Sequence, residues 1–320
     1  MQIPEQGIAR EQVLAEIEDL RADDADWKSG HTWSLVYHAS EDHSALLKDA
    51  YGALFSENGL NPIAFPSLRR LEAEVVRMTA TMLNGDAAVA GTMTSGGTES
   101  VLMAVKTYRD WGRATLGIEN PNMVLPRTAH AAFAKAGHYF DVEPIWIDVA
   151  ADLRADKKRM AEAVTADTVL MVGSAPNYPH GMIDPIEELA TIAAERGIGF
   201  HVDACLGGFL LPWIERLEYT VPLFDFRVPG VTSMSADVHK YGYAAKGAST
   251  VLYRTSALRR FQFHVTTGWP GGIYASPSMA GTRPGGAIAA AWAALRSMGA
   301  DGYLAIAEEL MAATRLLIDG

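Results

Sequence analysis

Hydrophobic residues recur along this chain in two spacings, one typical of helices and the other of buried strands. Between residues 68 and 82, apolar side chains stand at positions 68, 71, 75, 78 and 82, which is the spacing of one helix face. A second amphipathic pattern predicts an acidic helix from Arg10 to Asp26. From Ala87 onward, short apolar runs alternate with helical patterns such as Ile186–Glu195. This alternation predicts an α/β fold built on a mainly parallel sheet.

Seven of the short apolar runs are candidate strands. They are Ala87–Met93, Met123–Leu125, Pro144–Val149, Thr168–Gly173, Ile198–Asp203, Val231–Ala236 and Ala248–Tyr253. A sheet of this kind binds its ligands beyond the carboxyl ends of the strands. The polar and glycine residues that follow these runs are therefore the place where we expect the chemistry.

Composition and charge exclude several classes of function. The chain has 320 residues, of which 49% are hydrophobic, and a net charge of -11, which argues against nucleic acid or an anionic membrane as the main partner. The single cysteine, Cys205, excludes an internal disulfide and a cysteine-based zinc cluster, and we expect no metal site. The N-terminus lacks the apolar core of a signal peptide, and no run is long enough to span a membrane. We therefore expect a cytoplasmic protein.

A glycine-rich segment, GTMTSGGTES from Gly91 to Ser100, lies between a predicted strand and a predicted helix. Glycines let backbone amides approach an anion, and a helix N-terminus adds partial positive charge, so this segment is a candidate phosphate site. It is not a nucleotide-binding P-loop, because Gly97 stands where the phosphate-binding lysine is required. A turn that only allows close helix packing is the alternative interpretation.

Two further clusters follow predicted strands. In FHVDACLGG, Asp203 ends an apolar run, and a carboxylate there can pair with a protonated pyridine nitrogen. In SMSADVHKYGYAAKGAS, Lys240 follows another run, and a lysine in a buried setting can form a Schiff base. His130, in PRTAHAAF, can stack on a flat ring. Each residue alone has an ordinary structural interpretation, and it is their ordered set that favours a cofactor site.

The residues of six segments carry a family resemblance. TSGGTES, TAHAAF, PHGMIDPI, HVDACLGGF, FDFRVPGVTSMSADVHKYGYAAKG and GGIYASPSMAGTRPGG resemble the sphingosine-1-phosphate lyases, within the fold-type I pyridoxal-phosphate-dependent (group II) decarboxylases. The resemblance runs from about Trp33 to Gly302. It implies an aspartate-aminotransferase-like large domain with a seven-stranded sheet, pyridoxal 5'-phosphate as cofactor, and an active site at a homodimer interface.

The resemblance also implies domain boundaries. Residues 1–66 form an N-terminal helix and interface segment, residues 67–302 form the cofactor-binding domain, and residues 303–320 begin a C-terminal domain that is otherwise missing.

Individual roles follow from the same resemblance. Lys240 would carry the cofactor as a Schiff base, Asp203 would pair with the ring nitrogen, and His130 would stack on the ring. Gly97, Thr98 and His239 would hold the cofactor phosphate together with Thr282 from the other subunit. Tyr37, Asn61 and Lys246 would lie at the substrate, and Tyr178 at the reacting centre.

The implied reaction is a retro-aldol cleavage of a phosphorylated amino alcohol into phosphoethanolamine and a long-chain aldehyde. The base stays open among Tyr178, His130, Lys240 and a cofactor phosphate oxygen, with some preference for Tyr178. Asn61 stands where phosphate-binding members have a histidine, which keeps amino acid decarboxylation as an alternative. A catalytically incomplete, cofactor-binding fragment is a third interpretation, because the sequence ends within a helical pattern.

Overall fold

A computed structural model describes residues 2–32, 34–61 and 63–320 of the chain. Contacts divide the chain into two compact units, Met1–Tyr37 and His38–Gly320. The first unit contains helix α1 (Arg10–Leu20), which has no buried residue. This helix ends six residues before the predicted Asp26, and the acidic residues Asp23, Asp24 and Asp26 that follow are unfavourable at the negative end of a helix dipole. The predicted boundaries at residues 66 and 302 stay a prediction, and Trp33 lies outside the described residues.

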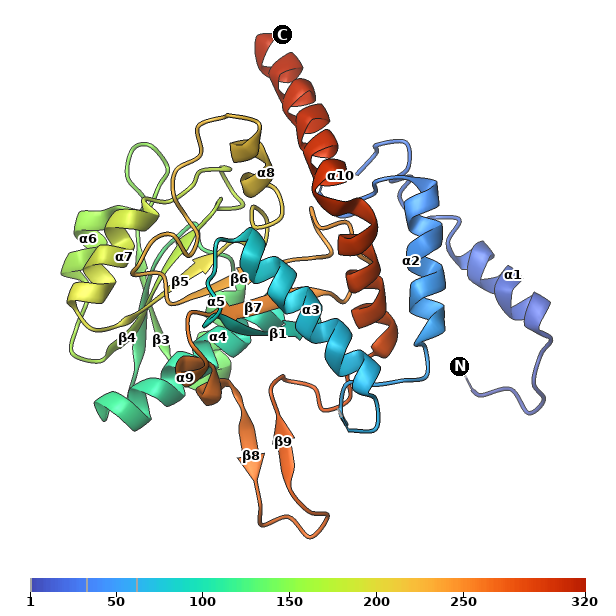
Figure 1. Cartoon of the computed structure of the whole chain (residues 1–320), viewed down its shortest axis with the longest axis horizontal. Helices are drawn as coiled ribbons and strands as arrows, with labels where there is room; N and C mark the ends of the chain where they lie inside the picture. Colours follow the sequence, from blue (N-terminus) through green and yellow to red (C-terminus); the bar gives the residue numbers. More distant parts are fainter. Residues whose placement is uncertain (1, 33, 62) are drawn as a thin grey trace. The chain divides into compact units, whose positions relative to one another are not determined.

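The second unit is built on a seven-stranded sheet whose strands lie in the order β1, β7, β6, β5, β4, β2, β3 (Figure 1). The strands are β1 (Ala90–Thr94), β2 (Asn122–Pro126), β3 (Glu143–Ile147), β4 (Thr168–Ser174), β5 (Gly199–Asp203), β6 (Ser233–Ala236) and β7 (Ser249–Tyr253). Strand β7 runs antiparallel to both of its neighbours, and strands β2 to β6 pair in parallel. All seven predicted strands are present, and the mainly parallel α/β fold is confirmed.

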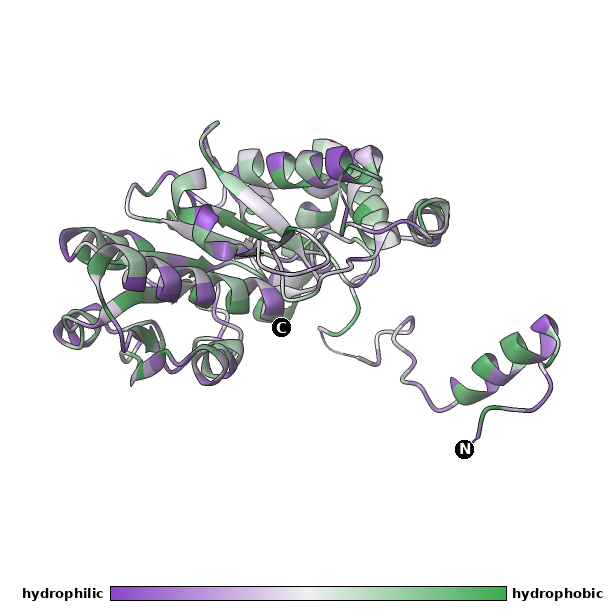
Figure 2. Ribbon diagram, turned by 90° about the horizontal axis from the view of Figure 1, so that it is seen from below, coloured by the Kyte–Doolittle hydropathy of each residue, from purple (hydrophilic) through white to green (hydrophobic). Residues whose placement is uncertain are grey.

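Helices pack around this sheet. They are α2 (Glu41–Ala53), α3 (Pro66–Met82), α4 (Gly97–Trp111) with a π-helical turn η1 (Gly112–Leu116), α5 (Ala132–Phe140), α6 (Lys157–Glu162), α7 (Ile186–Glu195), α8 (Leu211–Arg216), α9 (Ser256–Arg259), η2 (Arg260–Gln262) and α10 (Gly285–Asp319). Helix α4 is the most central, since its buried residues run from Glu99 to Val105 and continue at Thr107 and Tyr108. Figure 2 shows that the surrounding helices carry both hydrophobic and hydrophilic residues, as expected when one face meets the core.

Helix α3 begins at Pro66 and ends at Met82, so the helix predicted from the apolar spacing is confirmed. Helix α2 was not predicted, although Ser40 caps it by accepting a hydrogen bond from the His43 N–H at 3.0 Å. A side chain on Gly286 of α10 would lie 2.5 Å from the Tyr51 ring of α2, so glycine allows these two helices to pack closely.

A two-stranded hairpin of β8 (His264–Thr266) and β9 (Tyr274–Ser276) extends away from the sheet (Figure 1). Its apolar side chains include Val265 and Ile273, which are 57% and 77% exposed. Neither strand was predicted, because three-residue strands leave almost no alternating pattern in a sequence.

Candidate functional site

The candidate site lies at one edge of the sheet, where the carboxyl ends of β1, β5 and β6 meet the start of β7. The register pairs Thr94 with Ser249 and Ala236 with Thr250, and Asp203 pairs with Ser235. Segments more than 100 residues apart in sequence therefore deliver their following loops to the same place. This is the edge at which the sequence analysis expected the chemistry.

The glycine-rich segment forms the turn from β1 into α4. No side chain caps the helix, so the amide groups of its first turn are available to a ligand. A side chain at Gly97 would lie 2.8 Å from both Asp237 Oδ2 and Cys205 Sγ, and one at Gly96 would lie 3.4 Å from His239 Cε1. Glycine is therefore required at position 97 by the close approach of two other loops, and the turn has the character of an anion site.

A buried carboxylate, Glu99, holds this turn in shape. Its Oε2 atom accepts hydrogen bonds from the Ser95 N–H at 2.6 Å and from the Ser95 hydroxyl at 2.7 Å. Its Oε1 atom accepts one from the Met279 N–H at 2.9 Å, which brings the loop after β9 to the same turn. Sequence analysis missed Glu99, and the only available signal was its place in the first turn of a predicted helix.

Lys240 and Asp237 form an ion pair at this edge, with 3.0 Å between Lys240 Nζ and Asp237 Oδ2. Burial disfavours the charged form of the lysine, but the carboxylates of Asp237 and Asp203 outweigh this and raise the pKa of Lys240 above its ordinary value. The second oxygen, Asp237 Oδ1, is buried and has no hydrogen-bond partner among the described residues. Sequence analysis missed Asp237 as a site residue, although it stands in the same segment as Lys240.

Asp203 is 8% exposed and lies at the end of β5. Its Oδ1 atom accepts hydrogen bonds from the Cys205 N–H at 3.1 Å and from the Ser235 hydroxyl at 3.3 Å. In the part of the chain that the structure describes, no hydrogen bond reaches its Oδ2 atom. Burial raises the pKa of the Cys205 thiol, with the neighbouring carboxylates adding to the effect, so Cys205 is a neutral, buried neighbour.

His239 lies between the glycine turn and Lys246. Its Nδ1 atom accepts a hydrogen bond from the Ala248 N–H at 3.2 Å, so the ring hydrogen is on Nε2, which is 3.7 Å from Asp237 Oδ2. Burial lowers the pKa of His239, and it lowers that of Lys246 as well. Lys246 Nζ donates to the His239 carbonyl at 3.2 Å, so this lysine is attached to the loop that carries Lys240.

The structure thus brings Gly97, Asp203, His239 and Lys240 together. His130 and Tyr178 follow β2 and β4 on the same sheet edge, and both are exposed, Tyr178 by 62%. The His130 Nδ1 atom accepts a hydrogen bond from the Ala132 N–H at 3.1 Å. No hydrogen bond or ion pair between described residues links either side chain to Lys240, and their roles stay predictions.

The four remaining predicted residues each lie in a different segment. Thr98 is exposed in the first turn of α4, and Thr282 is exposed in the loop that contacts Glu99 through Met279. The side-chain oxygen of Asn61 accepts hydrogen bonds from the backbone N–H groups of residues 63 and 64 at 3.0 and 3.1 Å, so it stabilises its own turn. Tyr37 belongs to the first compact unit, and its role stays a prediction.

Comparisons with known proteins agree with this geometry. The model of the pyridoxal-dependent decarboxylase conserved domain matches residues 2–320. The chain is 48% identical over 320 residues to sphingosine-1-phosphate lyase of Dictyostelium discoideum, covering 99% of this chain and 60% of that protein. It is 32% identical over 315 residues to a probable L-aspartate decarboxylase of Pyrococcus furiosus, covering 98% of this chain and 83% of that protein.

A solved structure, the sphingosine-1-phosphate lyase of Burkholderia pseudomallei, matches with a TM-score of 0.93 and 44% identity over 96% of this chain and 72% of that chain. The family resemblance predicted from the motifs is therefore confirmed. The chain spans about 60% of the length of the Dictyostelium relative.

Proposed function

The chain belongs to the pyridoxal-dependent decarboxylase family, and from this premise we propose that it is a carbon-carbon lyase acting on a sphingoid-base phosphate. The products would be phosphoethanolamine and a long-chain aldehyde. The observation that carries this proposal is the higher identity to a sphingosine-1-phosphate lyase, 48%, than to a probable amino acid decarboxylase of the same family, 32%.

Pyridoxal 5'-phosphate is the cofactor of this family, and the residues at the sheet edge fit it. The uncapped first turn of α4 offers amide groups to a phosphate, and the space beside Gly97 is too small for any side chain. Asp203 keeps one carboxylate oxygen without a hydrogen bond from the described residues, as a partner for a ring N–H requires. The Lys240 side chain is 28% exposed, so its amine is accessible to a carbonyl group.

Each of these residues would have one task. The cofactor phosphate would be bound by Gly97, Thr98 and the Nε2–H of His239, together with Thr282 of a second subunit.

The other residues would contact the ring and its aldehyde carbon. His130 would pack against the ring. Asp203 would hold a proton at the ring nitrogen, and Lys240 would bind the cofactor covalently. Asp237 would hold the Lys240 amine in position, since the two atoms are 3.0 Å apart.

When bound, the cofactor supplies an electron sink for the bond that breaks beside the substrate amine. Tyr178, which is exposed in the segment after β4, would take the proton from the substrate hydroxyl. Lys246 and Tyr37 would bind the substrate phosphate, and this anchoring would orient the bond to be broken. Asn61 would contact the substrate through its turn rather than through charge.

We also propose a homodimer in the cytoplasm as the working form. The dimer rests on the family resemblance, which assigns Thr282 of a second subunit to the cofactor phosphate. None of the described helices is both long and apolar enough to cross a membrane.

A second candidate function is amino acid decarboxylation. The Pyrococcus relative favours it, since the match covers 83% of that protein. Asn61 favours it as well, because its side-chain oxygen is engaged with the backbone and supplies no positive charge to a substrate phosphate.

One experiment separates these candidates. The cofactor-loaded chain is incubated with a sphingoid-base phosphate while long-chain aldehyde is measured, and in parallel with L-aspartate while carbon dioxide is measured. We expect aldehyde formation that Lys240→Ala abolishes and that Lys48→Ala, at an exposed position of α2, leaves unchanged. Carbon dioxide without aldehyde would establish the decarboxylase instead, and bound cofactor with neither product would identify a cofactor-binding but inactive chain.

A further inference from the structure

A cavity of about 680 Å³ lies along β1, which is an outer strand of the sheet. We call it the β1-edge cavity. Its walls come from the loop before α3, from α3, from the segment leading into β1, and from α9 and the residue Arg283 before α10. The lining residues that matter here are Leu60, Phe65, Glu72, Ala88, Arg259 and Arg283.

Two arginines of this cavity, Arg283 and Arg259, differ in their partners. Arg283 binds Glu72 with both of its terminal nitrogens, at 2.6 and 2.9 Å, and the two side chains are only 13% and 18% exposed. This pair is complete in itself, because two parallel hydrogen bonds satisfy both carboxylate oxygens. Among the described residues, Arg259 has no such partner.

The Arg259 guanidinium donates to the Thr92 hydroxyl at 2.9 and 3.2 Å and lies 5.2 Å from the centre of the Phe263 ring. No carboxylate binds it within the described parts of the chain. Burial lowers the pKa of Arg259, Glu72 opposes this and Arg283 reinforces it. A half-buried arginine remains charged at any physiological pH, and the one carboxylate of the lining, Glu72, is already bound to Arg283, so the charge of Arg259 is not neutralised by it.

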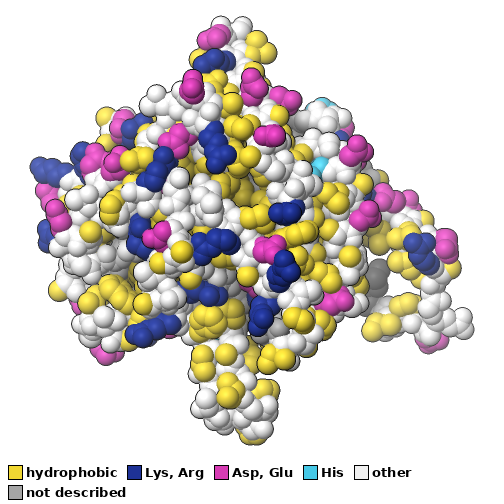
Figure 3. Space-filling model, in the orientation of Figure 1, with side chains coloured by type: hydrophobic (Ala, Val, Ile, Leu, Met, Phe, Trp, Pro, Cys, Tyr) yellow, Lys and Arg dark blue, Asp and Glu magenta, His cyan; other side chains and the backbone are white. Residues whose placement is uncertain are grey.

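The remaining wall of the cavity is apolar. Leu60, Phe65, Val76 and Phe263 line it beside the charged groups. Figure 3 shows Lys and Arg side chains gathered over the region of α3 and α9, above the hairpin of β8 and β9. The exposed Arg69 belongs to the same lining and adds to the positive potential at the opening.

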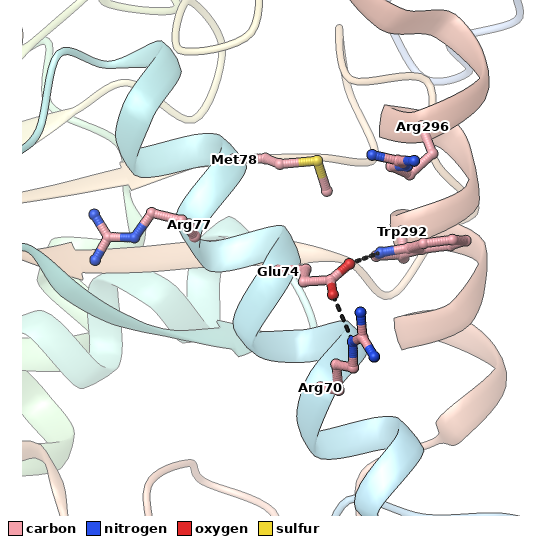
Figure 4. A pocket seen from close by; sticks show the side chains of 6 residues that line it. All are labelled: Arg70, Glu74, Arg77, Met78, Trp292 and Arg296. Carbon is pink, nitrogen blue, oxygen red and sulfur yellow. Dashed lines mark hydrogen bonds and ion pairs between the residues drawn. The ribbon is translucent and has the colours of Figure 1, made fainter. Parts of the chain in front are cut away.

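A neighbouring pocket of about 380 Å³ lies between α3 and α10 (Figure 4). Its charged groups differ from Arg259 in their partners. There Glu74 of α3 accepts hydrogen bonds from Arg70 of the same helix at 2.8 Å and from the Trp292 ring of α10 at 2.7 Å, and the second of these connects the two helices. Arg77 lines both hollows but donates to the carbonyls of Asp86 and Val89. The uncompensated, partly buried charge is therefore at Arg259.

We propose that the β1-edge cavity binds a small organic anion that has one carboxylate or phosphate group and a short apolar body. The anionic group would bind Arg259 and complete the charge balance with Arg283 and Glu72. The apolar body would lie against Phe65, Leu60 and Val76. The proposal rests on the contacts of Arg259 and not on the proposed activity.

The test is a binding titration of the cofactor-loaded chain with acetate, hexanoate and inorganic phosphate, followed by calorimetry. We expect hexanoate to bind more tightly than acetate, by roughly fourfold for each methylene that becomes buried. Arg259→Gln should weaken hexanoate binding about tenfold or more, since a charged hydrogen-bond donor is lost. Arg260→Gln removes the same charge one residue further on, outside the cavity lining, and should leave binding unchanged.

A second variant tests the proposal independently, in case Arg259→Gln does not fold. Ala88 is exposed and lines the cavity, so Ala88→Glu should fold normally and supply an internal carboxylate that weakens hexanoate binding. Equal hexanoate affinity in the wild type, Arg259→Gln and Ala88→Glu would overturn the proposal. Phosphate binding that depends on Arg259, without hexanoate binding, would overturn the apolar part. Absence of binding together with a changed subunit equilibrium in Arg259→Gln would show that the cavity belongs to an interface between copies.

Discussion

The Lys240 amine lies 3.0 Å from the carboxylate of Asp237, a residue that is 2% exposed and belongs to the loop after β6. This pairing keeps the proposed cofactor lysine charged in the free protein, although only a neutral amine attacks a carbonyl group. Asp237 thus holds the Lys240 amine in place and also lowers its reactivity as a nucleophile.

Asp237→Asn should move cofactor attachment to lower pH. Asp237 raises the pKa of Lys240, so removing its charge lowers that pKa and increases the neutral fraction of the amine at any given pH. The measurement is the pH dependence of the attachment rate, obtained by borohydride trapping and mass spectrometry. Asp301→Asn, an exposed change of the same kind, is the control. A midpoint that stays or rises in Asp237→Asn would show that Asp237 does not set the lysine pKa.

Gly97→Ala should weaken cofactor binding and destabilise the fold by about 1–3 kcal/mol. The added methyl group would lie 2.8 Å from Asp237 Oδ2 and from Cys205 Sγ, so the loops would have to separate. Urea unfolding and a cofactor titration measure the two effects. Gly52→Ala, inside α2 with no atom within 4 Å of the added group, should be neutral or stabilising. Equal behaviour of the two variants would contradict the close packing at Gly97.

Glu99→Gln should raise the cofactor dissociation constant about tenfold, while the protein stays folded. An amide has a single oxygen, so it cannot accept hydrogen bonds from both Ser95 and Met279, and the turn before α4 would lose part of its order. Fluorescence titration of the protein with cofactor measures the change. Glu119→Gln, at an exposed position, should bind the cofactor like the wild type. Unchanged affinity in Glu99→Gln would mean that the turn is held without this carboxylate.

We expect the buried His201 to lower the free energy of unfolding in acid. Burial lowers the pKa of His201 to about 4, whereas an unfolded histidine has a pKa of about 6.5. Below pH 6.5 the unfolded chain therefore binds a proton that the folded protein excludes, and stability falls with pH until the folded pKa is reached. The loss between pH 7 and pH 4 is about 3 kcal/mol.

The variant His201→Gln removes this titration, so its unfolding free energy relative to the wild type should shift by about 3 kcal/mol across that pH interval. Comparison with the wild type is needed because Asp184 acts in the opposite direction. Burial raises the pKa of Asp184 to about 6, and its protonation stabilises the folded state as the pH falls below 6. Urea denaturation at pH 7, 5.5 and 4 measures the difference, and parallel curves for the two proteins would contradict a neutral, buried His201.

Much of the fold could be predicted from the sequence because the buried strands are short, apolar and separated by helical patterns. Strand β4, predicted as Thr168–Gly173, is buried along its whole length from Thr168 to Ser174. Strand β1 begins three residues later than predicted, since Ala87 and Ala88 are exposed and precede the pairing with β7. An apolar composition alone does not say where strand pairing begins.

Two site residues could not be predicted for a related reason. Asp237 and Glu99 are ordinary acidic residues in their local sequence, and their importance comes from partners far along the chain. Glu99 accepts a hydrogen bond from the Met279 N–H, and the Asp237 carboxylate lies so close to Gly97 that no side chain fits there. No local sequence pattern predicts either of these contacts.

The sequence by itself determined the class of the fold, the order of its strands along the chain, and the segments that carry Lys240, Asp203 and the glycine turn. These follow from local properties, namely the period of apolar residues and the residue types that end each strand. The tertiary structure decided which of those segments meet, that Lys240 is paired with Asp237, and that Arg259 of the β1-edge cavity binds a hydroxyl and no carboxylate of the described residues. Burial and charge balance depend on contacts between distant residues, so they exist only once the chain has folded.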